Sequence, residues 1–259
     1  MSEYIAILDT ETTYPQQEVF DIAVLIGDKN GNVQFSRQWI IKEKIGQKLF
    51  YEEKRSLYLR RLRNPKYPAK FCSIKVCLNE MERIFQHYNI TEVYAYNMSF
   101  DSRVIKNIAN EFELNNPLIN REMECLWFWS CQTIFQQKSF PKFCIDNPKT
   151  GMTEKGNYKT SAENCFAYIT KQPGFVEEHT ALEDCKIEYA IYLHCLKQKK
   201  FRCRGIAHNV WLLVQTEEQI EKLPPQFRTM QVSLQEQVER ASQLVERFHK
   251  PLQVSIEGV

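Results

Sequence analysis

The stretch YIAILDTET, residues 4–12, joins a run of apolar residues to two acids. The apolar residues Tyr4 to Leu8 predict a buried strand, which ends at Asp9 with Glu11 two positions later. Residues two apart on a strand point to the same face, roughly 6.6 Å apart, so both carboxylates can reach one site. Because charge held near a low-dielectric core is costly, metal coordination is one of the few ways to offset that cost. The stretch therefore predicts a strand that ends in two acids, and the rest of the chain decides whether a metal site explains them.

Further apolar runs predict the rest of an α/β fold. The segment DKNGN, residues 28–32, contains Asn-Gly, a strong hairpin signal between two apolar runs. Three consecutive strands with short links predict antiparallel pairing at one side of a sheet. The other expected strands lie at residues 92–96 and at the start of the aromatic stretch 124–135, and helices are expected near 74–88, 161–170 and from 181 onward.

Composition limits the class of protein. A chain of 259 residues that is 43% hydrophobic can bury a full core, as one large domain or one domain with an appendage. The net charge of +2 is too near neutral to indicate a nucleic-acid binder by total charge. Nine cysteines without a C-x-x-C pair favour a reduced, intracellular chain. The sequence shows neither a signal peptide nor a long apolar span, so we expect a soluble, cytoplasmic protein with no membrane partner.

One basic run offers two interpretations. Residues 54–70, KRSLYLRRLRNPKYPAK, interleave Arg and Lys with Tyr and Leu. The preferred interpretation is a solvated helix face with an apolar underside. The alternative is a binding patch, because interleaved cations and aromatics suit a phosphate backbone with stacked bases.

A third acid follows the short strand at residues 92–96. The segment NMSFD, residues 97–101, places Asp101 in the first turn of the next helix, with Ser99 as the expected N-cap. A carboxylate is favoured there by the helix dipole, so Asp101 taken alone is an ordinary helix acid.

A fourth acid begins the helix at residue 181. Thr180 and Glu183 form a T-x-x-E capping-box pattern, which starts the helix and places Asp184 on its first turn. His179 then lies just outside the helix. Four carboxylates at element ends, with no cysteine among them, suit Mg²⁺ or Mn²⁺ better than zinc.

Three motifs appear in a set order over about residues 1–200. They are D-x-E-T at 9–12, N-x-x-F-D at 97–101 and H-x-x-x-x-D at 179–184. In this the chain resembles the DEDDh-type 3′–5′ exonucleases, the group that includes RNase T, oligoribonuclease and the epsilon proofreading subunit. The resemblance implies a ribonuclease-H-like fold: a mixed five-stranded sheet, helices on both faces and the first three strands antiparallel. Residues 1–200 would form this domain and residues 201–259 a mostly helical C-terminal extension.

The resemblance also implies a role for each motif acid. Two Mg²⁺ ions are expected, with Mn²⁺ as a substitute. Asp9 would lie between the ions, Glu11 and Asp184 on the ion that activates water, and Asp101 on the other. His179 would be the general base, since an unperturbed imidazole titrates near ~6.5.

Four more residues are expected at the substrate. Thr10 and Thr12 would contact the sugar of the terminal nucleotide. Phe100 would stack beside a base, with ordinary packing under the helix as an equal alternative. Asn97 is interpreted first as a turn-forming residue and is included among the residues that line the substrate site.

The expected activity is metal-dependent 3′–5′ exonuclease action that releases nucleoside 5′-monophosphates from single-stranded 3′ ends, with DNA favoured over RNA. One alternative is a 3′–5′ exoribonuclease or oligoribonuclease-like enzyme. Another is a non-catalytic nucleic-acid-binding or scaffold module, with the C-terminal segment making the functional contact. The amphipathic stretch at residues 233–249 would pack on its own domain, on a second copy in a homodimer, or on a protein partner.

Overall fold

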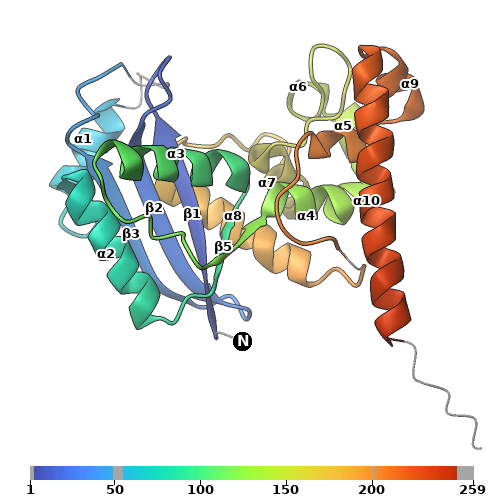
Figure 1. Cartoon of the computed structure of the whole chain (residues 1–259). Helices are drawn as coiled ribbons and strands as arrows, with labels where there is room; N and C mark the ends of the chain where they lie inside the picture. The colour runs from blue at the N-terminus through green and yellow to red at the C-terminus, as the bar shows by residue number, and fades with distance from the viewer. Residues whose placement is uncertain (1–2, 49–54, 201, 250–259) are drawn as a thin grey trace, which may run out of the picture.

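The computed structural model describes residues 3–48, 55–200 and 202–249. The first residue of the basic run, Lys54, and the ends of the expected C-terminal extension lie outside this part of the chain. Three strands come first, strands and helices then alternate, and only helices follow β6 in the described chain (Figure 1). The described elements are, in order, β1 (Tyr4–Thr12), β2 (Val19–Asp28), β3 (Val33–Ile41), α1 (Arg55–Arg63), β4 (Ala69–Cys72), α2 (Ile74–His87), β5 (Glu92–Ala95), α3 (Met98–Glu111), β6 (Glu122–Cys125), α4 (Leu126–Gln132), η2 (Ile134–Gln136), α5 (Ser139–Asp146), α6 (Pro148–Gly151), α7 (Ala162–Thr170), α8 (Ala181–Leu196), η3 (Val210–Leu213), α9 (Glu217–Glu221) and α10 (Pro225–His249).

One mixed sheet organises the described chain, in the strand order β4-β3-β2-β1-β5-β6. Strands β1, β2 and β3 pair antiparallel, whereas β4, β5 and β6 each join their neighbour in parallel. This confirms the expected α/β class and the antiparallel start. The sheet has six strands rather than the expected five, because β4 adds to the edge beside β3. This four-residue strand is held by backbone pairing and carries little apolar pattern, so the sequence did not reveal it.

The hairpin between β2 and β3 forms where Asn-Gly predicts it. Asp28 accepts hydrogen bonds from the backbone amides of Asn30 and Asn32, at 2.8 and 2.9 Å. Gly31 has φ of +97°, a conformation that glycine adopts without the steric cost of a side chain. The turn is therefore closed by local side-chain bonds and by one residue without a Cβ.

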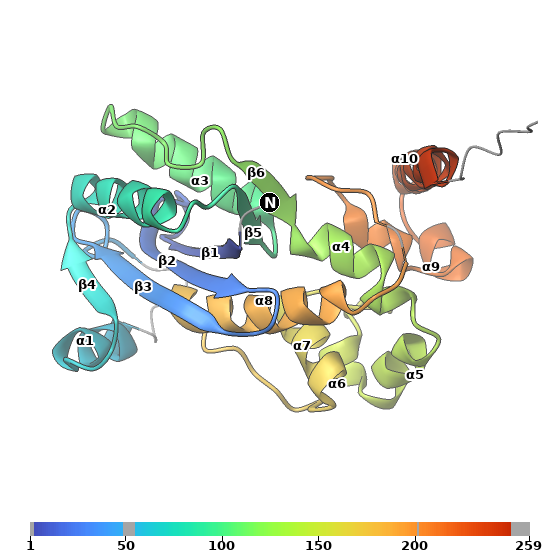
Figure 2. The same cartoon turned by 90° about the horizontal axis from the view of Figure 1, so that it is seen from below.

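Helices cover both faces of the sheet. Helix α8 lies on one face and α2 and α3 lie on the other (Figure 2). Every residue of β2 is buried as a result. Gly27 of β2 admits the ring of Tyr189 from α8, since a Cβ there would lie 2.5 Å from the ring. This close contact packs α8 against the hairpin end of β2, where the hydroxyl of Tyr189 donates to the backbone oxygen of Asp28 at 2.7 Å. The N-terminus of α8 lies at the opposite end of the strands, where β1 carries the acids.

The basic run only partly matches its preferred interpretation as a solvated face. Helix α1 buries Tyr58 and Arg61, and Arg55 donates to the backbone oxygens of Ile45 and Gln47. The exposed cations of this helix are Arg60 and Arg63. Arg61 turns inward because acids of a distant loop, described below, supply its counter-charges.

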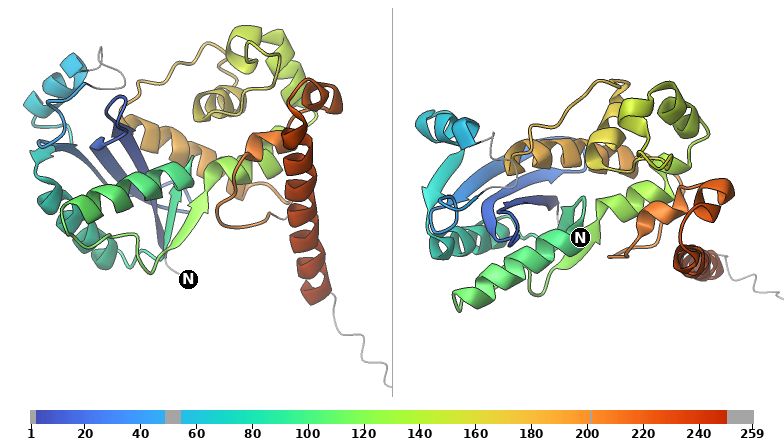
Figure 3. Two further views of the ribbon diagram at one scale, coloured as in Figure 1. Left: turned by 45° about the horizontal axis from the view of Figure 1, so that its top comes forward. Right: turned by 90° about the horizontal axis from the view of Figure 1, so that it is seen from above.

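The segment after α8 returns to the sheet edge. Arg202 and Arg204 bind the buried carboxylate of Glu124 at 2.8 and 2.6 Å, and Arg202 stacks on the ring of Trp129. Beyond it, η3, α9 and α10 gather beside α4, away from β1 (Figure 3). This confirms a helical C-terminal region, while the division at residue 200 stays a prediction. No helix in the described ranges is both long enough and apolar enough to cross a membrane.

Candidate active site

The end of β1 presents its acids as the sequence predicts. Asp9 and Glu11 are half-buried and share one face, whereas Thr10 and Thr12 between and beyond them are buried on the other. Glu11 lies opposite Asp21 of β2. The strand thus points two carboxylates toward the start of α8.

Asp101 reaches the same end from α3. The helix begins two residues earlier than expected, at Met98 with Asn97 as its N-cap, so Ser99 lies inside the first turn. The carbonyl of Asn97 already accepts the amide of Phe100 at 2.7 Å, which closes that turn. Asp101 is 3% exposed and accepts a hydrogen bond of 2.7 Å from the hydroxyl of Thr10. The hydroxyl of Thr10 therefore orients Asp101, and its predicted contact with a sugar stays a prediction.

Helix α8 begins at Ala181, as predicted, but without the expected capping box. The hydroxyl of Thr180 accepts a hydrogen bond from the guanidinium of Arg61 instead of a helix amide. The carboxylate of Glu183 accepts from the hydroxyl of Tyr67 at 3.2 Å. Both partners come from segments more than a hundred residues away, and a charged donor outcompetes a local backbone amide.

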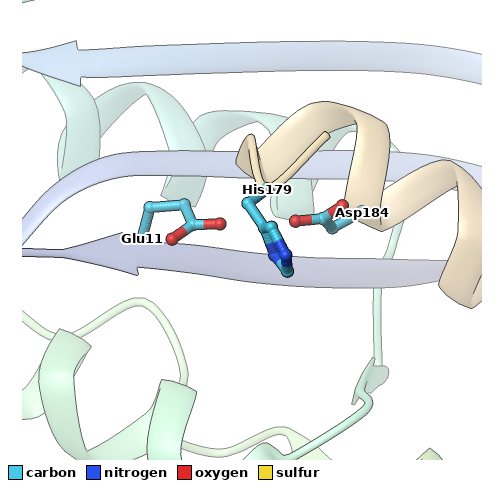
Figure 4. A group of neighbouring side chains, drawn as sticks. All are labelled: Glu11, His179 and Asp184. Atoms are coloured by element: carbon cyan, nitrogen blue, oxygen red, sulfur yellow. The ribbon is translucent and has the colours of Figure 1, made fainter. Parts of the chain in front are cut away.

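His179 completes the group beside Glu11 and Asp184. One ligand atom from each of these three residues lies within 4.8 Å of the other two. The two carboxylates face each other with the imidazole between them (Figure 4). The backbone φ of His179 is 52°, a left-handed conformation that costs about 1–3 kcal/mol and needs support from its surroundings.

Helix α1 and strand β2 provide that support. The hydroxyl of Tyr58 donates to the backbone oxygen of His179 at 3.2 Å, and Arg61 binds the side chains of Glu178 and Thr180 on either side. The carboxylate of Asp21 accepts the amide of Ala181 at 3.1 Å. The loop before α8 is thus held from one face by residues distant in sequence.

Replacing Arg61 by alanine should allow the loop that carries His179 to shift. We expect kcat for nucleic-acid hydrolysis to fall about 10–100-fold, because a shift of about 1 Å in a catalytic group has effects of this size. The loop at residues 177–180 would also exchange its amide hydrogens faster, which hydrogen-exchange mass spectrometry measures. Ser56→Ala, at an exposed position of the same helix, is the control and should change neither. Unchanged exchange in the Arg61 variant would contradict the supporting role.

Burial and mutual repulsion raise the pKa values of the acids at this site. Burial raises the pKa of Asp9 strongly, and the charges of Glu188, Asp184 and the other acids raise it further. Burial likewise raises the pKa of Asp101 to about 7, although the Thr10 hydroxyl partly offsets this. The pKa of Asp184 also rises to about 7, again chiefly through burial. The site therefore favours a state in which some of its negative charge is neutralised.

The donor set suits divalent cations. Asp9 Oδ2 and Asp184 Oδ1 are fully buried atoms, and neither accepts a hydrogen bond from the residues that the structure describes. Buried carboxylate oxygens without donors are costly unless a cation neutralises them. Hard oxygen ligands of this kind match Mg²⁺ and Mn²⁺. The residues present thus fit the ions implied by the motif resemblance.

Two of the expected substrate residues, Asn97 and Phe100, lie at the start of α3 near Asp101. Phe100 is half-buried against the core, and the guanidinium of Arg103 lies over its ring at 5.2 Å. Asn97 is exposed and its side chain makes no capping bond to α3. Both the packing role and the stacking role of Phe100 are compatible with this position, so its contact with a base stays a prediction.

The sequence interpretation missed three acids near the motif residues. Asp21, Glu177 and Glu188 each have one buried carboxylate oxygen without a hydrogen-bond partner among the described residues. Burial raises the pKa of Asp21 to about 7 and that of Glu177 to about 8. Glu188 is detectable in principle, since it follows Asp184 by one helical turn and shares its face. The position of Asp21 depends on the pairing of β1 with β2, which no local pattern reveals.

Comparisons with solved structures define the fold. The chain aligns with cell-death related nuclease 4 (CRN-4) at a TM-score of 0.50 and 14% identity, over 76% of this chain and 66% of that one. It also aligns with the nuclease domain of 3′hExo, described as a DEDDh family member bound to rAMP, at a TM-score of 0.49, 13% identity and 76% and 92% coverage. A 3′-exonuclease in a structure of histone mRNA stem-loop recognition aligns at 0.47, 14% identity and 76% and 82% coverage. No family model and no curated protein sequence matches the chain.

The chain therefore shares the fold of cell-death related nuclease 4, and its mixed sheet agrees with the ribonuclease-H-like fold that its three motifs imply. It spans slightly less than two thirds of the length of cell-death related nuclease 4.

Proposed function

We propose that this protein is a metal-dependent 3′–5′ exonuclease that releases nucleoside 5′-monophosphates from single-stranded 3′ ends. One observation carries the proposal. Glu11 lies beside His179 and Asp184, and Asp101 is hydrogen-bonded to Thr10, the residue between Asp9 and Glu11. Asp9 and Asp184 each keep one buried oxygen without a partner among the described residues. A structural role for these acids would call for donors around them, whereas a cation site leaves such oxygens available.

Two divalent ions would be held by Asp9, Glu11 and Asp184 on one side and by Asp9 with Asp101 on the other. When bound, such ions stabilise the attacking and leaving oxygens of an in-line displacement at phosphorus. The imidazole of His179 takes the proton of the attacking water as the oxygen bonds to phosphorus. The bond from phosphorus to the 3′ oxygen of the preceding nucleotide then breaks. The products are a nucleoside 5′-monophosphate and a strand shortened by one residue.

Hydrolysis of a labelled single strand is expected to require Mg²⁺ or Mn²⁺, to stop with excess chelator, and to resume when the ion is restored. Chromatography of the products should show nucleoside 5′-monophosphates. Products that carry a 3′-phosphate would contradict the proposed direction of attack. A folded protein without hydrolysis in either ion would favour the non-catalytic nucleic-acid-binding or scaffold module.

We propose DNA as the favoured substrate, with short RNA as the alternative. No residue of the sequence marks itself as a sensor of the 2′-hydroxyl, which an enzyme restricted to RNA would need. The exposed Arg60 and Arg63 of α1 suit a strand longer than a dinucleotide. Comparing kcat/KM for matched DNA and RNA oligomers of several lengths at one salt concentration tests this choice. Faster cleavage of RNA at every length, or action only on RNAs of about two to five residues, would overturn the DNA preference.

The location of the protein, its division into domains and its partner surface are also proposals. The cytoplasm is the proposed location, and residues 1–200 and 201–259 the proposed division of the chain. Helix α10 is the proposed contact for a second copy or a protein partner, because much of its described surface is exposed.

A further inference from the structure

Glu188 is a buried acid that no motif of the chain includes. It lies in α8 one turn beyond Asp184, so the two side chains leave the same face of the helix. Its side chain is 3% exposed, and its Oε2 atom makes no hydrogen bond to the described residues. The backbone amide of Tyr96, at the end of β5, donates to the carboxylate. One oxygen of Glu188 is thus held in place, while the other is buried and free.

The Oε2 atom of Glu188 is buried on the side of the molecule that holds the motif acids. Among the acids, Glu188 exerts the largest charge effect on Asp9, ahead of Asp184, Asp101 and Glu11. In turn, Asp101 exerts the largest charge effect on Glu188. Strand pairing places Glu188 on the same side: Ile7 of β1 pairs with Tyr94 of β5, so two residues further on Tyr96, whose amide holds Glu188, lies beside Asp9. Asp101 stands in the first turn of α3, which follows Tyr96. No lysine or arginine in the described ranges forms an ion pair with it.

We propose that Glu188 is a fifth carboxylate of the metal centre, which strengthens binding of the second divalent ion on the side of Asp9 and Asp101. This inference rests on the proposed metal-dependent function and names a residue of the same site. A buried carboxylate with a free oxygen and no cationic partner is costly in the protein without ions. A divalent ion beside Asp9 supplies the missing counter-charge. Supporting groups around metal ligands typically change affinity about 10–100-fold.

The test measures ion binding alone, without substrate. Isothermal titration and electron paramagnetic resonance with Mn²⁺ are expected to count two ions on the wild-type protein. In the Glu188→Gln variant, the affinity for one of the two ions should fall by about 10-fold or more. The affinity for the other ion should change by less than about threefold. Melting curves with and without Mn²⁺ compare the same variant with wild type. The variant's gain in melting temperature on adding Mn²⁺ should be smaller.

Glu183→Gln is the matched control. It removes one charge from the same turn of α8 as Asp184, but its carboxylate is already paired with Tyr67, Lys186 and Arg61, and glutamine can still accept from all three. Both Mn²⁺ affinities should stay within about threefold of wild type. If Glu188→Gln fails to fold, Glu188→Asp retains the charge but withdraws the carboxylate by one methylene. This second variant should weaken the second ion by about threefold or more.

The outcomes separate the two levels of the proposal. If both Glu188 variants bind two ions with wild-type affinities, Glu188 is a buried structural acid and the inference is wrong, while the proposed nuclease function stands. If the wild-type protein binds no Mn²⁺, the metal-dependent function is wrong and the inference falls with it.

Discussion

Replacing Asp9 by asparagine is expected to lower kcat for hydrolysis of a single-stranded 3′ end by about 10³-fold or more. Asparagine preserves the shape of the side chain but removes the charge that is shared, in the proposed site, by both ions. Asp9 also has a buried oxygen without a hydrogen-bond partner in the described chain, so the substitution deprives no protein donor of its acceptor at that atom. The loss should therefore come from chemistry and not from unfolding.

Phe100→Ala provides the comparison. Loss of a stacking contact is worth about 1–3 kcal/mol and should raise KM more than it lowers kcat. Steady-state kinetics on one oligomer, with melting curves for both variants, measures the difference. Equal losses in two folded variants that bind metal would show that the roles of Asp9 and Phe100 are wrongly assigned.

Without divalent ions, the protein is expected to be more stable near pH 5 than near pH 8. The pKa of Asp101 and that of Asp184 are each raised from 3.8 to about 7 in the folded protein, mainly by burial. A raised folded-state pKa means that the folded protein binds protons more tightly than the unfolded chain does. The contribution to stability is therefore complete below about pH 4 and is lost as the pH rises toward 7. For either group taken alone the loss amounts to about 4 kcal/mol.

Melting curves in chelator at pH 5 and pH 8 measure this effect, and repeating them with Mg²⁺ shows its origin. Mg²⁺ should raise the melting temperature more at pH 8, where the carboxylates are ionised, than at pH 5, where protons compete with the ion. Asp184→Asn should flatten the dependence on pH. Part of the pH dependence should remain in that variant, because burial also raises the pKa of Asp21 to about 7. Asp21 is held by its hydrogen bonds to Gln38 and Ala181, which the substitution leaves in place. Equal or greater stability at pH 8 in chelator would contradict the predicted charge crowding.

Local patterns predicted the parts of the fold that depend on near neighbours. The apolar run before Asp9 forms β1, and the Asn-Gly pair closes the hairpin after Asp28, because each signal acts within a few residues. The start of α8 at Ala181 was likewise predicted, although its expected capping bond was not formed. The edge strand β4 was missed because its pairing with β3 is a backbone interaction without a clear side-chain pattern.

The sequence by itself determined which acids stand at the ends of elements and in what order, since the three motifs are contiguous stretches of chain. Only the tertiary structure decided what surrounds them. Arg61 turns inward to Thr180 and Glu178 across more than a hundred residues, and Glu188 is buried because α8 packs on β1 and β2. Burial and charge are properties of the assembled neighbourhood, and a linear pattern records neither the distance nor the dielectric between residues far apart in the chain.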